Sequence, residues 1–139
     1  MFDQCLYFNT TALARVLDRV WTDAFAPFGL TPSQAFLLRA VLDQPGMLQR
    51  ELAREMAISR PTATRSLDGL QEKGLVERRD SERDGREYEI HPTAAAMAIK
   101  TELNAASAEV TRRLKREFGV AMFEETVRNV KEIRATLNE

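Results

Sequence analysis

Residues 59–66 combine small hydroxyl side chains with arginines and contain no acidic residue. Ser59 and Thr62 carry hydroxyls that can bind phosphate oxygens, and the free backbone amides at the start of a helix bind the same groups. Arg60 and Arg65 carry guanidinium groups, each of which can donate two hydrogen bonds to a guanine in the major groove. Such a segment is typical of a helix that contacts DNA.

A second segment with suitable chemistry is a polar, turn-rich loop that joins residues 75–79 to residues 86–90. Both flanking stretches alternate polar and apolar residues, which predicts two antiparallel strands with a protruding tip. The tip carries Arg83 close to Gly85 and Arg86. It is therefore shaped to reach a phosphate or the minor groove, whose negative potential attracts arginine.

Helices are predicted around both segments, because apolar residues recur there at spacings of three and four. They cover about residues 11–28, 32–43, 49–56, 59–73, 93–118 and 120–138. Gly29 ends the first helix, and Thr31 with Gln34 forms a capping box at the start of the second. Only Ala57 and Ile58 separate the third helix from the fourth, which forces a sharp angle between them.

The order of helix, short helix, tight turn, second helix and hairpin predicts a winged helix-turn-helix. The fold class is mainly α, with a small β component. The fourth helix would bury Ala63, Leu67 and Leu70 on one side. The opposite side would then present Pro61, Thr62, Arg65 and Gly69.

The flanking helices are longer than this core needs. The helix over about residues 93–118 would span on the order of 37 Å, and monomers rarely tolerate an exposed apolar patch of several hundred Å². We therefore expect one domain with a DNA-binding lobe at about 30–91 and dimerisation helices at about 1–28 and 92–139. Pairing about a two-fold axis would place two reading helices about 34 Å apart on a pseudo-palindrome.

The composition excludes several classes of function. The 139 residues have a net charge of −1, and residues 50–89 hold nine Lys and Arg against ten Asp and Glu. DNA affinity would therefore depend on which face each charge occupies.

One cysteine, one histidine and no phosphate-binding glycine loop predict no enzyme activity, metal or cofactor. The lack of a membrane span and of a signal peptide, with a single cysteine, predicts a cytoplasmic protein.

The stretch from Leu30 to Ala95 resembles the MarR family of bacterial transcription regulators. The matching segments are Leu30-Thr31-Pro32-Ser33-Gln34, Glu51-Leu52-Ala53, Ile58 to Arg65, Leu67 to Arg78 and Asp84-Gly85-Arg86. The resemblance implies a homodimeric DNA-binding repressor whose affinity for its operator responds to a small molecule or an oxidant. Leu48 departs from the family, which usually has a capping threonine there, so we expect no side-chain cap on that helix.

The resemblance also implies roles for single residues. The helix from Ser59 would enter the major groove and the tip between Arg83 and Arg86 the minor groove, while Asp84 would hold Arg86 by a charge-assisted hydrogen bond. The predicted DNA-binding residues are Ser59, Arg60, Pro61, Thr62, Thr64, Arg65, Arg83 and Arg86, with Asp84 and Gly85 supporting the loop.

An effector pocket is a further implication, because family members typically lose DNA affinity when a small aromatic acid or an oxidant acts on them. Candidate lining residues are the aromatic Trp21, Phe25, Phe28 and Phe36. The effector would be a small aromatic or phenolic molecule, and Arg15, Arg19 and Arg39 are the candidates for binding a carboxylate on it. The alternative interpretation is that the aromatic residues form packed core and that the arginines lie on the surface.

Cys5 has two interpretations. Its surroundings, Gln4 to Phe8, resemble those of the peroxide-sensing cysteine in the organic-hydroperoxide regulators. Those relatives activate the thiol with tyrosines, whereas the corresponding region here offers Phe25 and Pro32. The other interpretation is an inert, buried cysteine.

The near-zero net charge leaves a second function open. A winged-helix module can bind another protein without touching DNA. That alternative predicts that the exposed face of the helix after Ser59 is masked or electrically neutral.

Overall fold

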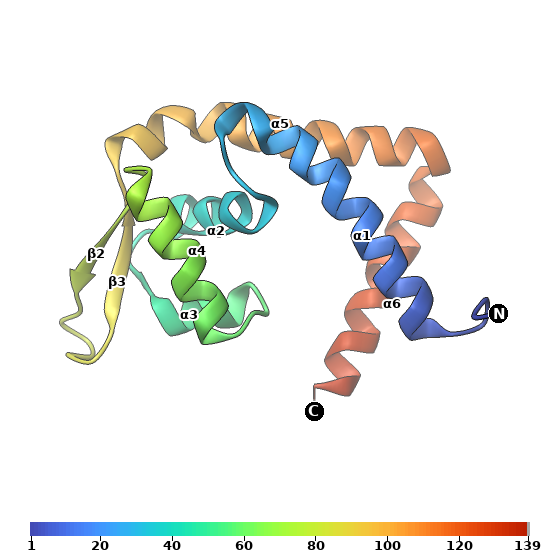
Figure 1. The fold of residues 1–139 in the computed structure, drawn as a ribbon, viewed down its shortest axis with the longest axis horizontal. Coiled ribbons are helices and arrows are strands. Elements are labelled where there is room, and N and C mark those ends of the chain that lie inside the picture. Colours follow the sequence, from blue (N-terminus) through green and yellow to red (C-terminus); the bar gives the residue numbers. More distant parts are fainter. Residues whose placement is uncertain (139) are drawn as a thin grey trace.

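Residues 1–138 are described by a computed structural model, in which they form six α-helices, one short 3-10 helix and three strands. The elements are α1 (Leu6–Phe25), η1 (Ala26–Phe28), α2 (Pro32–Asp43), β1 (Met47–Leu48), α3 (Gln49–Glu55), α4 (Arg60–Glu72), β2 (Val76–Asp80), β3 (Tyr88–Pro92), α5 (Ala94–Phe118) and α6 (Val120–Leu137). Figure 1 shows α2, α3, α4 and the hairpin gathered at one end, with α5 leading away to α1 and α6. The predicted mainly α, winged helix-turn-helix architecture is confirmed.

Helix α2 lies at the centre of the lobe that α2, α3, α4 and the sheet form. Its predicted start is confirmed, because Thr31 Oγ1 accepts a hydrogen bond from the Gln34 amide at 3.2 Å and Gln34 Oε1 accepts one from the Thr31 amide at 3.1 Å. Its buried residues are Ala35, Leu37, Leu38, Val41 and Leu42. They pack with residues from α1, α3, α4, α5 and the sheet into one hydrophobic core.

Leu38→Ala is expected to destabilise the protein by about 2–5 kcal/mol, because it removes a fully buried side chain and leaves a cavity in the core. Chemical denaturation followed by circular dichroism measures this change. Met97→Ala is the matched control, since its side chain is 58% exposed and the loss should stay within about 0.5 kcal/mol. Equal losses in the two variants would contradict the position given to α2.

The first helix differs from its predicted bounds. It begins at Leu6 rather than near residue 11, and the chain continues through the 3-10 turn η1 to Gly29, whose φ of +67° favours glycine. The apolar residues near its start did not reveal the helix because they face outward: Leu6 and Tyr7 are exposed. The last residue of the predicted range 92–139 lies outside the described residues.

The sheet contains one strand that was not predicted. Strand β1 pairs antiparallel with β3, which also pairs with β2, so the order is β1-β3-β2. A strand of two residues is too short to show an alternating pattern. Strands β2 and β3 begin one and two residues later than predicted, and Arg78 lies opposite Ile90.

The turn between α3 and α4 is as tight as predicted. Ala57 adopts a φ of +55°, which is uncommon for a residue with a side chain, and the Ile58 amide donates to the Ala53 carbonyl at 3.0 Å. Gly69 was predicted to face away from the core, but it is half-buried beside α2: a Cβ atom there would lie 2.4 Å from Nε2 of the Gln34 side chain.

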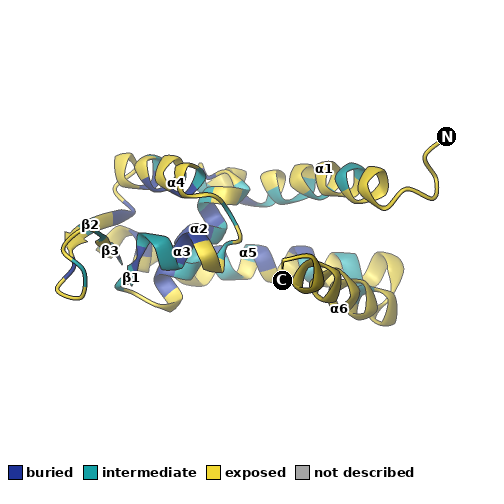
Figure 2. Ribbon diagram, turned by 90° about the horizontal axis from the view of Figure 1, so that it is seen from below, coloured by how far each residue is buried: buried dark blue, intermediate teal, exposed yellow. Residues whose placement is uncertain are grey.

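The terminal helices extend beyond the lobe, as predicted, and leave apolar side chains uncovered. Figure 2 shows α6 almost entirely as exposed residues, and α1 as exposed residues with half-buried ones between them. The large exposed apolar residues on these helices and at the end of α5 include Leu6, Tyr7, Leu13, Val16, Phe118, Val120, Met122, Val127, Val130, Ile133 and Leu137. Along residues 1–138, no helix is both long enough and apolar enough to cross a membrane.

Candidate nucleic-acid interface

The start of α4 presents hydroxyls and amides to solvent. Ser59 is the N-cap: its Oγ accepts a hydrogen bond from the Thr62 amide at 3.3 Å and donates one to Thr62 Oγ1 at 2.9 Å. Pro61 lies in the first turn, where a residue without an amide proton costs no hydrogen bond. The helix therefore begins at an exposed end, with positive dipole potential and hydroxyls available for an anionic ligand.

Two exposed arginines lie on this part of α4. Arg60 and Arg65 form no ion pair within residues 1–138, and Arg65 makes one long contact, 3.4 Å, from Nη2 to Thr62 Oγ1. Thr64 is exposed beside them and accepts a hydrogen bond of 2.7 Å from Nε2 of Gln49 on α3. The N-terminal half of α4 therefore carries uncompensated positive charge.

Ion pairs neutralise other arginines of the same lobe, whereas those at the start of α4 keep their charge. The pairs are Arg50–Asp84 at 2.7 Å, Arg78–Asp68 at 2.8 Å, Arg83–Glu51 at 3.2 Å and Arg79–Glu77. Within the described part of the chain, Arg54, Arg60, Arg65 and Arg86 have no such partner. The face of α4 is neither masked nor neutral there, contrary to what a protein-interaction module predicts.

The wing is the loop between β2 and β3. Asp84 holds Arg86 by a charge-assisted hydrogen bond, as predicted, and it does so through the backbone: one carboxylate oxygen accepts from the Arg86 amide at 3.0 Å. The other oxygen accepts from Nη1 of Arg50 at 2.7 Å, a contact that was not predicted. The amide of Arg86, and after it the Arg50 side chain, lower the pKa of Asp84. Arg86 itself is exposed.

Arg83 folds back toward α3. Its guanidinium donates to Glu51 at 3.2 Å and to the Gly46 carbonyl at 3.3 Å. The sequence analysis placed Arg83 at the tip of the wing with Arg86. It could not predict the pairing with Glu51, because Glu51 lies 32 positions earlier in the chain.

A hollow between α4 and the wing brings residues of both predicted segments together. It has a volume of about 630 Å³. Its lining residues are Gln49, Thr64, Asp68, Gln71, Arg78, Arg86, Glu87 and Tyr88. Thr64 and Arg86 were predicted site residues, whereas Gln49 and Tyr88 were not. Gln49 opens α3 and carries no local signal of its contact with α4.

Comparison with known proteins agrees with this arrangement. A family model described as MarR family matches residues 28–87. The uncharacterized HTH-type transcriptional regulator YwoH of Bacillus subtilis is 30% identical over 105 residues, which cover 76% of this chain and 76% of YwoH. The chain belongs to the MarR family of transcriptional regulators.

This MarR-family chain is also similar to a second curated protein and to a solved structure. The uncharacterized HTH-type transcriptional regulator YybA of Bacillus subtilis is 28% identical over 58% of the chain, and the match spans about half of YybA, 54%. The crystal structure of a MepR–DNA complex from S. aureus has a TM-score of 0.83 at 18% identity, covering 97% of this chain and 99% of MepR. This likeness shows the fold.

The aromatic residues of the expected effector pocket of this MarR-family protein pack against one another. Ring centroids of Trp21, Phe25 and Phe36 lie 5.2–5.8 Å apart, and Phe25 is fully buried. Arg39 stacks over Phe36 and donates to Asn104 at 2.8 Å and Ser107 at 2.7 Å, and burial lowers its pKa.

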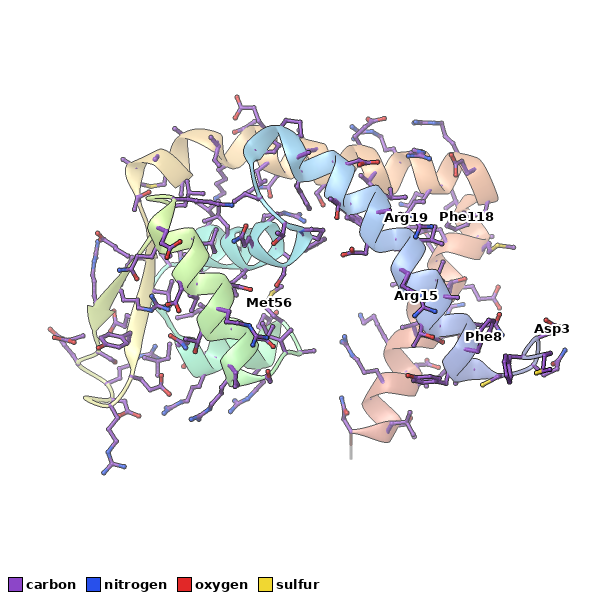
Figure 3. All side chains as sticks on the ribbon, viewed as in Figure 1. Asp3, Phe8, Arg15, Arg19, Met56 and Phe118 are labelled. Atoms are coloured by element: carbon purple, nitrogen blue, oxygen red, sulfur yellow. The ribbon has the colours of Figure 1, made fainter. Side chains whose placement is uncertain are left out.

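Phe28 is the exception among the four aromatic residues. It lines a surface pocket of about 550 Å³ together with Pro27, Gly29, Lys73, Leu75, Ala95 and Ile99. Arg15 and Arg19 lie on exposed positions of α1, and Figure 3 shows both on the part of that helix that extends away from the lobe. The structure therefore separates these two arginines from Phe28.

Cys5 is exposed, so the expectation of a buried cysteine is wrong. Its sulfur accepts a hydrogen bond of 3.5 Å from the Phe8 amide and caps α1. Among residues 1–138, no cluster of side chains could hold a metal ion.

Proposed function

We propose that this protein is a sequence-specific DNA-binding transcriptional regulator whose α4 enters the major groove. One observation supports this most strongly: Arg60 and Arg65 are exposed and unpaired on the N-terminal half of α4, while four other arginines of the lobe are neutralised. Ser59, Pro61, Thr62 and Thr64 surround them. The amides and hydroxyls would bind phosphates, and the guanidinium groups would read base edges.

We further propose that the protein acts as a homodimer through α1, α5 and α6. The apolar residues that these helices expose form a larger uncovered surface than a monomer usually retains. A two-fold axis through this surface would cover it on both copies and direct two α4 helices to successive turns of a pseudo-palindromic operator. We propose that it acts as a repressor, because a dimer bound over a promoter would exclude polymerase.

Regulation by a small molecule or an oxidant completes the proposal. The pocket at Phe28 lies between η1, the end of α4 and the start of α5, so an aromatic ligand bound there would act on the angle between the lobe and the long helices. The exposed Cys5 is accessible to oxidants. Either signal would change the spacing of the two α4 helices and thereby the affinity for DNA.

Fluorescence anisotropy with duplexes selected from a random library tests DNA binding. We expect dissociation constants in the nanomolar range, and affinity that falls steeply with salt as counterions are released. Equal affinity for selected and unselected duplexes would contradict sequence-specific binding. Absence of binding even at low salt would favour the protein-interaction module.

Repeating the titration with salicylate, as a small aromatic acid, and with hydrogen peroxide, as an oxidant, tests the two proposed signals.

A further inference from the structure

Two neighbouring residues of α3 bind two neighbouring residues of the wing, and the charges alternate. Arg50 pairs with Asp84 at 2.7 Å, and Glu51 pairs with Arg83 at 3.2 Å. We refer to these four residues as the α3–wing clasp. Because each side offers one cation and one anion, the two pairs join the elements without adding net charge.

The clasp is anchored at the base of the sheet. The second carboxylate oxygen of Glu51 accepts a hydrogen bond of 2.9 Å from the Leu48 amide in β1, and this bond, with the interaction with Arg83, lowers the pKa of Glu51. Arg83 also donates to the Gly46 carbonyl, directly before β1. Strand β1 pairs with β3, which forms one side of the wing. Movement of the wing against α3 would therefore break several contacts together.

At its other end, the clasp determines the position of the Arg86 backbone. The buried Ser81 hydroxyl accepts from the amides of Arg83 and Asp84 at 3.1 and 3.2 Å. The Asp84 carboxylate, held by Arg50, accepts from the Arg86 amide. A continuous set of hydrogen bonds thus leads from α3 to Arg86, whose side chain lines the hollow beside α4.

We infer that Arg50, Glu51 and Arg83 are positioning residues: the clasp that they form with Asp84 holds the wing against α3, and Arg83 contributes to DNA affinity through this clasp and not by contacting DNA. The inference rests on the proposed DNA binding. Arg83 has its charge compensated by Glu51, whereas Arg86 is exposed without an ion pair in the described part of the chain. A wing held in place before binding loses less conformational entropy on the duplex. Arg83 thus contributes to affinity through the clasp.

The two roles of Arg83 predict different salt dependence. If Arg83 only positions the wing, Arg83→Ala should weaken binding roughly 3- to 10-fold and leave the slope of log affinity against log salt concentration unchanged. Arg86→Ala, which would remove a phosphate or groove contact, should lower the magnitude of that slope by about one. A slope lowered by about one in Arg83→Ala would overturn the inference. Arg79→Ala is the matched control, because Arg79 is an exposed arginine of β2 that is paired with Glu77 in the same strand. Its loss should change affinity no more than about two-fold.

A charge exchange tests the clasp itself. Arg83→Glu and Glu51→Arg should each weaken binding, and the double variant should recover part of the affinity because the ion pair is restored with the total charge unchanged. The bonds to the Leu48 amide and the Gly46 carbonyl are not restored. If Arg83 bound DNA directly, Glu51→Arg would tighten binding and the double variant would not recover. Thermal unfolding of each variant verifies that the lobe remains folded.

Hydrogen exchange of the free protein separates this inference from the proposed function. The amide of Arg86 should exchange faster in Glu51→Arg than in the parent protein and should be protected again in the double variant. If the parent protein bound no DNA, this measurement would still test the clasp. Unchanged exchange at Arg86 in all three proteins would overturn it.

Discussion

Val130→Asp on α6 is expected to convert the proposed dimer into a monomer and to lower DNA affinity by at least about 100-fold. Val130 is 51% exposed in the single chain, so the charge costs the folded protomer little. In a dimer the same position would be covered, and an aspartate there would be buried without a partner. Loss of the second α4 would remove the gain that comes from binding two half-sites at once.

Light scattering after size-exclusion chromatography measures the mass, and fluorescence anisotropy measures the affinity. Ala135→Asp is the matched control: it is exposed on the same helix, and five residues at about 100° each place it on the other side from Val130. The control should remain a dimer with unchanged affinity. If Val130→Asp also stayed dimeric and bound DNA normally, the exposed face of α6 would not be the dimer interface.

The parts of the fold that the sequence predicted are those that local interactions determine. The capping box of Thr31 and Gln34 connects residues three positions apart, and the structure contains it. The left-handed conformation of Gly29 is likewise a local requirement, although α1 itself ends at Phe25 and Gly29 follows the 3-10 turn η1. Strand β1 was missed because its only reason to be extended is β3, more than 40 residues later in the chain.

The site was predictable to a similar extent. Helical spacing was sufficient to place Pro61 and Arg65 on the exposed face of α4. The partner of Asp84 was not predictable, because Arg50 lies 34 positions away and nothing near it in sequence indicates that α3 faces the wing. The packing of Trp21 against Phe36 is likewise a contact between residues of different helices. Sequence alone therefore could not decide whether these aromatic residues line a pocket or pack in the core.

Arg65→Ala is expected to weaken binding to the selected duplex by about 1–3 kcal/mol, or roughly 5- to 150-fold, and to relax base preference at one position of each half-site. The reason is that Arg65 is exposed and unpaired, with a single long contact to Thr62 that a better acceptor on DNA would replace. A guanidinium that reads guanine donates two hydrogen bonds in one plane. A phosphate contact would instead weaken binding equally on every sequence.

Arg65→Lys separates these two roles, because it keeps the charge and removes the planar pair of donors. If Arg65 reads a base, the lysine variant should lose most of the discrimination between the selected duplex and single-base variants while keeping its affinity for unselected DNA. Arg54→Ala, which removes an exposed and unpaired arginine of α3, is the control for general charge and should leave base preference intact. An Arg65→Lys variant with the specificity of the parent protein would assign Arg65 to the phosphate backbone and leave Arg60 as the reading arginine of α4.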